Sequence, residues 1–436
     1  MKCFSLLIIS NVRSLKEIGD IKDMIISFAL TGICLAGAFI SFRHVQWNAS
    51  SILVKVLLVE MAVACVLLVT QRFNKKAFNV LLVLVSVLFS IYISNYSMNT
   101  TTFDNQVYAQ VNELMDTVQD DNVMHRIKNY YPIQNNYPLI IKRSGMSNYL
   151  HVVHRKQVNF DRNMGYEQNW NRMSDEGGTL VSDTLLGYTT LISEEQFPDS
   201  VGCNERKTTN YYVYGTIVKS NAWLMDSNCT DVIYQSTALE TQQAVNKSVF
   251  NSDSMNIQVL EGYVPGTDVH IVSIDKKSLV YINVWSDHGL TISVGDKEVC
   301  SNFNGSQILL AGEYDNDIEL KIVNTGEYYL VDVGVLDVEQ YYVDLKDKLT
   351  DVEVKQSGTK MTLTFNSDTD QYLLVPLFND DGFLYYVNGN KVNALRFLDT
   401  LMMIPVSEGG NVVELSYFQP GLKVGALLSL VGIIFM

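Results

Sequence analysis

The stretch AFNVLLVLVSVLFSIYISN, from Ala77 to Asn95, divides the chain into two parts of opposite character. It holds 19 residues without a charge, and about 20 apolar residues in a helix are enough to cross the ~30 Å hydrocarbon core of a bilayer. A helix also satisfies its backbone hydrogen bonds within a single segment, as lipid requires. The stretch therefore predicts a membrane-spanning helix, with a mostly apolar region before it and a long polar region after it.

Two more apolar segments precede this stretch, at residues 25–42 and 52–70, and both are predicted to span the membrane. The predicted membrane region thus covers residues 1–95 and contains three helices. Residues 421–436 are again apolar up to the last residue, which predicts a terminal transmembrane helix that continues beyond this chain. Glu60 falls inside the second segment, where a carboxylate is either a functional residue or a neutral or paired group facing another helix.

The loop charges predict an orientation for these segments. Arg72, Lys75 and Lys76 lie in the six-residue gap between the second and third predicted spans. Positively charged loops stay on the cytoplasmic side of a membrane. The third span then leads outward, and the polar region of residues 96–419 is predicted to be a large extracytoplasmic domain of a multi-pass membrane protein.

The charge of the polar region limits its partners. The whole chain has 32 basic and 47 acidic residues, a formal net charge of −15, and residues 96–419 contain 22 basic and 43 acidic ones. A domain this acidic binds the phosphate backbone of a nucleic acid poorly, so no nucleic-acid partner is expected. The six cysteines show no spacing typical of a zinc site, and no metal site is predicted.

The polar region changes character along its length. Val107, Val111, Leu114 and Val118 recur at helical spacing, and mixed helices and strands predict an α/β domain over residues 96–250. The polar run 245–254 resembles a linker between this domain and the next.

Strand patterns dominate after the linker, and they predict two β-sandwich-like modules at residues 257–345 and 350–419. Asn388-Gly389 predicts a tight hairpin turn, because both central residues of such a turn need positive φ. The predicted strands are Leu279–Trp285, Leu290–Val294, Ile318–Val323, Tyr328–Leu336, Val352–Val354, Met361–Phe365, Tyr372–Leu377, Phe383–Val387, Leu401–Ile404 and Val412–Tyr417. The predicted fold class is a multi-pass α-helical membrane segment with an extracytoplasmic α/β domain and two β-sandwich-like modules.

No strong catalytic motif is present, since the chain lacks a P-loop, a GxSxG elbow and an HExxH pair. Adjacent carboxylates occur at Asp175-Glu176 and Asp380-Asp381. Two carboxylates can hydrolyse a glycosidic bond, but adjacency in sequence does not set the separation that this needs.

Aromatic residues are a more specific signal. One stretch combines them with arginines, and this mixture predicts either a surface that receives a sugar or a lipid-linked phosphate, or the core and rim of an α/β domain. These residues are Tyr130, Tyr131, Tyr137, Tyr149, Tyr166 and Trp170, beside Arg126, Arg143 and Arg155.

Three groups of short motifs resemble the YfhO family of bacterial membrane proteins, from about Ile25 to the C-terminus. The first is Arg126 with Asn136-Tyr137-Pro138-Leu139 and Ser144-Gly145-Met146-Ser147-Asn148-Tyr149. The second is Gly177-Gly178-Thr179 followed by Asp183-Thr184-Leu185-Leu186-Gly187-Tyr188. The third is Val375-Pro376, Gly382-Phe383, Val387-Asn388-Gly389, Glu414-Leu415-Ser416-Tyr417 and Pro420-Gly421-Leu422-Lys423-Val424-Gly425.

The resemblance implies a GT-C-like glycosyltransferase linked to the decoration of lipoteichoic acid at the bacterial cell membrane. It implies a polyprenyl-phosphate sugar as donor, with no other cofactor identified and a divalent cation as an option, and the lipid bilayer and a cell-wall polymer as partners. Family members use an acidic residue of the first extracytoplasmic loop, but residues 43–51 contain none. The chain therefore resembles the C-terminal part of such a protein, without its catalytic loop.

The candidate ligand-binding residues from this comparison are Arg126, Asn136, Tyr137, Asp183 and Asp381. For Arg126, Asp183 and Asp381 a structural role is the first interpretation, since Asp183 and Asp381 sit in turn-like settings where carboxylates commonly cap backbone amides. A non-enzymatic, membrane-anchored adhesion or scaffold protein is the alternative for the chain as a whole.

Overall fold

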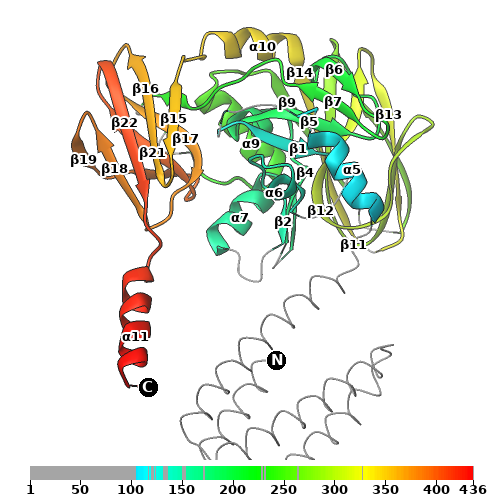
Figure 1. Cartoon of the computed structure of the whole chain (residues 1–436). Coiled ribbons are helices and arrows are strands. Elements are labelled where there is room, and N and C mark those ends of the chain that lie inside the picture. The colour runs from blue at the N-terminus through cyan, green and yellow to red at the C-terminus, as the bar shows by residue number, and fades with distance from the viewer. Residues whose placement is uncertain are drawn as a thin grey trace, which may run out of the picture. The chain divides into compact units, whose positions relative to one another are not determined.

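The computed structural model in Figure 1 describes residues 105–435, with gaps at 116, 119–121, 123, 131–135, 150–153, 170–171, 227–228, 230–231, 263–264 and 327. The predicted spans at 25–42, 52–70 and 77–95 lie outside the described residues, as does Glu60. Within the described residues strands predominate, and they form five sheets.

The first region contains two small sheets and four helices. β1 and β5 are parallel neighbours in a sheet of order β1-β5-β7-β6, and β4 lies between β2 and β3 in the other sheet. The strands are β1 (Arg126–Asn129), β2 (Asn148–Tyr149), β3 (Tyr166–Asn169), β4 (Arg172–Gly177), β5 (Tyr188–Ser193), β6 (Cys203–Lys207) and β7 (Tyr212–Gly215). The helices are α5 (Asn105–Met115), α6 (Tyr137–Ile140), α7 (Arg155–Asn163) and α8 (Leu180–Leu185).

The second region is a six-stranded antiparallel sheet. Its order is β10-β13-β11-β14-β9, and β12 pairs with the long strand β11. The strands are β9 (Met255–Gly262), β10 (Gly266–Val272), β11 (Ser278–Val294), β12 (Lys297–Tyr314), β13 (Ile318–Asn324) and β14 (Tyr329–Asp337). Helix α9 (Ala238–Val249) packs on β9 and β14, and α10 (Val338–Lys346) follows β14.

The third region contains two sheets that share one apolar core. Their orders are β15-β16-β22-β18-β19 and β20-β21-β17-β8, so β8 (Trp223–Met225) joins a sheet built from much later residues. The other strands are β15 (Glu353–Ser357), β16 (Lys360–Ser367), β17 (Gln371–Phe378), β18 (Phe383–Val387), β19 (Asn390–Val392), β20 (Leu395–Phe397), β21 (Leu401–Val406) and β22 (Gly409–Tyr417). Leu363 and Val413 of one sheet pack in the same cluster as Leu373 and Ile404 of the other.

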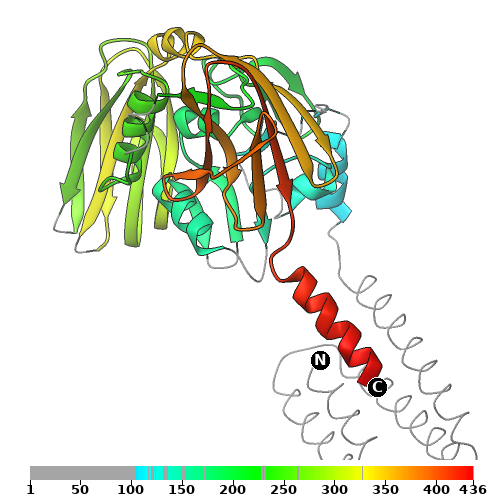
Figure 2. The ribbon, with the colours of Figure 1, turned by 90° about the vertical axis from the view of Figure 1, so that its left-hand side faces the viewer.

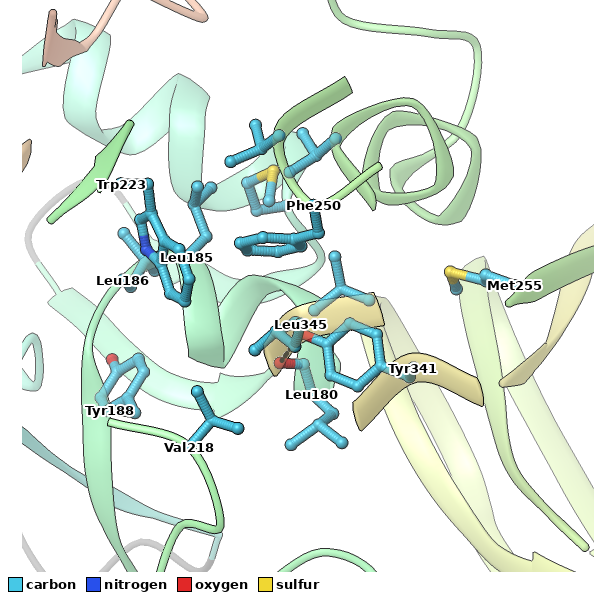
Figure 3. Close-up of a cluster of buried hydrophobic side chains, with 14 of the residues drawn as sticks. Leu180, Leu185, Leu186, Tyr188, Val218, Trp223, Phe250, Met255, Tyr341 and Leu345 are labelled. Atoms are coloured by element: carbon cyan, nitrogen blue, oxygen red, sulfur yellow. Dashed lines mark hydrogen bonds between the residues drawn. The ribbon is translucent and has the colours of Figure 1, made fainter. Parts of the chain in front are cut away.

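A large apolar cluster joins the three regions, and Figure 3 shows part of it. Trp223 lies edge-on to Phe250, with ring centroids 4.9 Å apart, and Phe250 lies edge-on to Tyr341 at 6.1 Å. These three side chains are fully buried. Because they come from β8, the end of α9 and α10, burial of their rings ties distant parts of the chain together.

The predicted linker at 245–254 is wrong in its first half, because those residues belong to α9. Val245, Asn246 and Val249 are buried there. The helix begins at a capping box in which the Thr237 side chain accepts from the backbone N–H of Glu240, and the Glu240 side chain accepts from that of Thr237. Several polar residues that resembled a linker are therefore buried, among them Asn246, Ser252 and Ser254.

The predicted fold class is also wrong for the part of the chain that the structure describes. Strands outnumber helices there, and none of the seven helices between residues 105 and 435 is long and apolar enough to cross a membrane. The predicted terminal span at 421–436 is the helix α11 (Leu422–Phe435) of 14 residues, drawn in red in Figure 2. Its described side chains are exposed.

Candidate functional site

The structure brings three of the predicted site residues into one buried region around β1. Arg126 lies on β1, Tyr137 in α6 and Asp183 in α8, and all three are buried. Arg126 donates to the carbonyl oxygens of Leu186 and Pro376, so its guanidinium connects β1 to β17 of the third region. The arginine thus holds two regions of the fold together.

The other two described candidates lie elsewhere. Asn136 precedes α6 with φ of 67°, and its side-chain oxygen accepts from the backbone N–H of Tyr149 at 2.9 Å. Asp381 lies between β17 and β18 with 89% of its side chain exposed, and it pairs with Arg396 at 3.1 Å. The structure therefore does not unite the five candidates in one site.

The centre of the buried region is an ion pair that the sequence analysis missed. Lys128 Nζ lies 2.7 Å from Asp183 Oδ1 and 2.8 Å from its Oδ2, and both side chains are almost completely buried. Tyr166 and Tyr130 donate their hydroxyls to the two Asp183 oxygens, at 2.8 and 3.2 Å. Lys128 also donates to the carbonyl oxygen of Gly177 at 2.6 Å. Every charged atom of the pair is therefore hydrogen-bonded.

Burial and ion pairing shift the pKa values of Lys128 and Asp183 in opposite directions. Burial lowers the pKa of Lys128, and the charge of Asp183 offsets part of that shift. Burial raises the pKa of Asp183, and the attraction of Lys128 and the hydrogen bonds from Tyr166 and Tyr130 oppose the rise. Lys128 Nζ also lies 4.4 Å from the centroid of the Tyr130 ring, whose π face attracts a cation.

A second buried carboxylate lies beside the pair. Asp175 Oδ2 accepts from the hydroxyl of Tyr137 at 2.6 Å and from the backbone N–H of Asn129 at 3.2 Å. Burial raises the pKa of Asp175 to about 7, although these hydrogen bonds lower it. We name Lys128, Asp183, Asp175, Tyr130 and Tyr166 the buried centre. Because its polar atoms are satisfied within the protein, its arrangement is that of a structural network.

An accessible site lies on the other side of α7, in a groove between this helix and the third region. The volume of the groove is about 250 Å³. Its lining combines three aromatic rings with polar side chains from two distant parts of the chain. The lining residues, which we call the α7 groove, are His154, Lys156, Gln157, Phe378, Asn379, Asp380, Phe383, Thr400 and Tyr417.

Contacts in the first turn and the middle of α7 fix this helix against β17 and against the turn between β20 and β21. Phe160 is fully buried and lies edge-on to Phe378, with centroids 6.0 Å apart. Lys156 pairs with Asp399 at 2.7 Å, and the hydroxyl of Thr400 donates to the carbonyl oxygen of Lys156 at 3.4 Å. The helix therefore presents its first turn to the groove in a fixed position.

The opposite wall is aromatic. The rings of Phe383 and Tyr417 lie 4.7 Å apart, at an interplanar angle of 54°. The turn before β18 packs closely on them, because a Cβ atom at Gly382 would lie 2.6 Å from both the carbonyl oxygen of Phe418 and the Tyr417 ring. Asp380 Oδ1 accepts from the backbone N–H of Gly382 at 2.8 Å, which fixes its carboxylate next to this wall.

The chemistry of the α7 groove suits a polyhydroxylated ligand. Aromatic faces stack on the apolar faces of a sugar ring, while carboxylate, amide and imidazole groups accept or donate to hydroxyls. Asp380, Gln157 and His154 supply these polar groups. No group of His, Cys, Asp and Glu suitable for a metal ion occurs among the described residues.

Sequence reasoning missed most of these residues for identifiable reasons. Lys128 lies in the strand sequence Arg126-Ile-Lys-Asn129, whose polar alternation resembles an exposed strand, yet all four residues are buried. His154 and Gln157 are 220 or more residues from Phe378 and Phe383 in the chain. The available signal was the motif around Gly382-Phe383 and Tyr417, which the sequence comparison did single out.

The fold and the groove define a β-rich domain with an aromatic-walled groove. The chain matches the profile of the family described as "Bacterial membrane protein YfhO" over residues 3–258 and 309–429. It belongs to this family, which confirms the resemblance predicted from the motifs and makes it a bacterial membrane protein.

One relative is the "Uncharacterized protein YfhO" of Bacillus subtilis (strain 168). It is 21% identical over 379 residues, which cover 72% of this chain and 43% of the relative. The chain thus spans less than half the length of this relative.

Similarities to solved structures are weak. A conserved protein of unknown function from Pseudomonas aeruginosa PAO1 has a TM-score of 0.17 and 11% identity, over 38% of this chain and 75% of that one. The arabinofuranosyltransferase AftD from Mycobacteria has a TM-score of 0.15 and 11% identity, over 34% of this chain and 12% of that one. Scores this low do not establish a shared fold.

Proposed function

We propose that the protein acts in cell-surface glycosylation and that its described domain binds the acceptor saccharide in the α7 groove. In this proposal the sugar comes from a polyprenyl-phosphate carrier, and the acceptor is a cell-wall polymer of the lipoteichoic acid type on the outer face of the membrane. Membership of a bacterial membrane protein family supports a role at the membrane surface.

The observation that carries the proposal is the composition of the groove. Phe383 and Tyr417 offer two ring faces, and Asp380 lies next to them with a fixed carboxylate. Gln157 and His154 face this wall from α7. Aromatic stacking combined with a few oriented polar groups is the usual chemistry of a small-ligand site, and here it fits a saccharide better than an apolar ligand.

The groove contributes positioning to the reaction. Holding an acceptor hydroxyl in a fixed place converts an encounter between two molecules into a step within one complex. Phe383 and Tyr417 would fix the plane of the sugar ring, and Asp380 and Gln157 would fix its rotation within that plane. The buried centre has no part in binding, because it is closed to ligands and its polar atoms are already satisfied.

The test compares surface polymers from cells that produce the wild-type protein, a Phe383→Ala variant or no protein. The proposal expects the sugar content of the purified polymer to fall in the last two strains, as measured by mass spectrometry. Trp285→Ala is the matched control, since Trp285 is an exposed aromatic residue of β11 that does not line the groove. Unchanged sugar content in the strain without the protein contradicts the proposal.

The second candidate function is a membrane-anchored adhesion or scaffold protein that binds a wall polymer without modifying it. The same aromatic groove supports this function, since its residues suffice for binding alone. The two functions differ in one outcome. Loss of polymer binding in Phe383→Ala, together with unchanged sugar content in the strain without the protein, favours the scaffold.

A further inference from the structure

Some charged side chains around the α7 groove have a partner of opposite charge, and others do not. Lys156, which lines the groove, pairs with Asp399 at 2.7 Å, and Arg396 pairs with Asp381, the neighbour of Asp380, at 3.1 Å. Asp380 lines the groove itself, and it belongs to none of the ion pairs formed among the described residues. A ligand in the groove therefore meets one carboxylate that has no cation as its partner.

The position of this carboxylate relative to the aromatic wall is set by a backbone hydrogen bond. Its Oδ1 accepts from the backbone N–H of Gly382 at 2.8 Å. Partial burial and, secondarily, the charge of Asp380 raise the pKa of the Tyr417 phenol, as expected for a carboxylate that faces this hydroxyl. The negative charge thus lies at the edge of the ring faces on which a sugar would stack.

We infer that the α7 groove selects a saccharide with a free amino group, whose ammonium pairs with Asp380 while its ring stacks on Phe383 and Tyr417. The inference rests on the proposed function, since it names the substrate class of the same groove. A charge-assisted hydrogen bond is roughly twice as strong as a neutral one, and the ring faces attract the same cation. A phosphate or carboxylate held next to Asp380 is repelled by its charge, so the phosphates of a wall polymer would lie outside the groove.

The test measures the affinity of the purified full chain for three trisaccharides of the same length. They are the glucosamine trisaccharide, its N-acetylated form and a sulfated form, at about pH 6, where the sugar amine is protonated and aspartates are ionised. We expect the amine form to bind about three- to fivefold more tightly than the N-acetylated form, and the sulfated form to bind most weakly.

Two variants isolate the carboxylate. Asp380→Asn is expected to remove the preference for the amine and to leave the affinity for the N-acetylated form unchanged. Asp381→Asn is the matched control, because Asp381 is the adjacent residue, is exposed and is already paired with Arg396. It should keep the preference, and thermal unfolding of both variants checks that they fold.

The outcomes separate this inference from the proposed function. Equal affinity for the amine and N-acetylated forms overturns the inference and leaves the groove as a saccharide site. Equal loss of preference in both variants also overturns it, since the selection would then come from general surface charge. Binding of none of the three forms overturns the inference and also removes the role that the proposed function gives to the groove.

Discussion

The buried centre and the α7 groove contain the same kinds of side chain but differ in what those side chains still offer. The buried centre has Lys128 and Asp183 surrounded by tyrosines, and both charges are fully used within the protein. The groove has Asp380 beside Phe383 and Tyr417 in a volume of about 250 Å³. A cluster of charged and aromatic residues therefore indicates a binding site only where a ligand can reach it and where some of its charges lack a partner within the protein.

The largest expected effect comes from breaking the buried ion pair. Lys128→Met leaves Asp183 buried without its cation, and loss of one partner of a buried pair costs about 3–5 kcal/mol. Chemical denaturation should show this loss in the free energy of unfolding. Lys355→Met is the control, because that lysine is exposed and its pairing with Glu353 is worth little. Equal effects of the two substitutions would show that the buried pair is not structural.

Removal of the arginine that joins β1 to β17 is the next largest change. Arg126→Met leaves the carbonyl oxygens of Leu186 and Pro376 without this donor, at a cost of about 2–3 kcal/mol. The midpoint of denaturation should fall accordingly. Arg162→Met, an exposed position near the end of α7, should change it by less than about 0.5 kcal/mol. A ligand-binding Arg126 would instead give lower affinity at unchanged stability.

A smaller effect is expected where the turn before β18 packs on the aromatic wall. Gly382→Ala places a methyl group 2.6 Å from the carbonyl oxygen of Phe418, so the turn must move, at about 1–3 kcal/mol. The moved turn carries Asp380, and saccharide affinity should fall as well. Gly266→Ala is the control, because no heavy atom lies within 4 Å of a Cβ placed there. Wild-type affinity in Gly382→Ala would contradict the assigned geometry.

Taken per pH unit, the smallest effect concerns the pH dependence of the buried centre. Because burial raises the pKa of Asp175 to about 7, the folded state holds a proton there that the unfolded state has lost above about pH 4. Folding stability should therefore decrease as pH rises from about 4 to 7, by at most about 1.4 kcal/mol per pH unit. Asp175→Asn should flatten this slope, measured as the free energy of unfolding at several pH values. The exposed Asp253→Asn should leave it unchanged.

The sequence predicted local structure where pattern and turn chemistry agree. Asn388 and Gly389 have φ values of 50° and 80° and join β18 to β19, which confirms the predicted hairpin turn. The predicted strand Ile318–Val323 is β13. Strand β12 (Lys297–Tyr314) was not predicted, because its sequence lacks regular alternation and its pairing with β11 is interrupted by several shifts in register.

The sites were less predictable because they depend on burial and on contacts between distant residues. Asp183 was named from a motif, but its partner Lys128 is 55 residues away, and only burial shows that the pair is closed. The groove forms because α7 lies against Thr400. The residue of α7 that Thr400 contacts, Lys156, is 244 residues away in the chain. Membership of the family could be predicted because its short motifs can be read directly from the sequence, whereas contacts between distant residues cannot.

The most direct test of the difference between the two regions is the saccharide affinity of two single variants of the full chain. Phe383→Ala removes a ring of the groove, and Tyr130→Phe removes a hydroxyl that donates to Asp183 at 3.2 Å in the buried centre. We predict that Phe383→Ala weakens binding by about tenfold, as expected for loss of one stacking ring worth roughly 1.4 kcal/mol, while Tyr130→Phe binds like the wild type and unfolds more easily. Wild-type affinity in Phe383→Ala, or weaker binding in folded Tyr130→Phe, would contradict the assignment of the groove as the functional site.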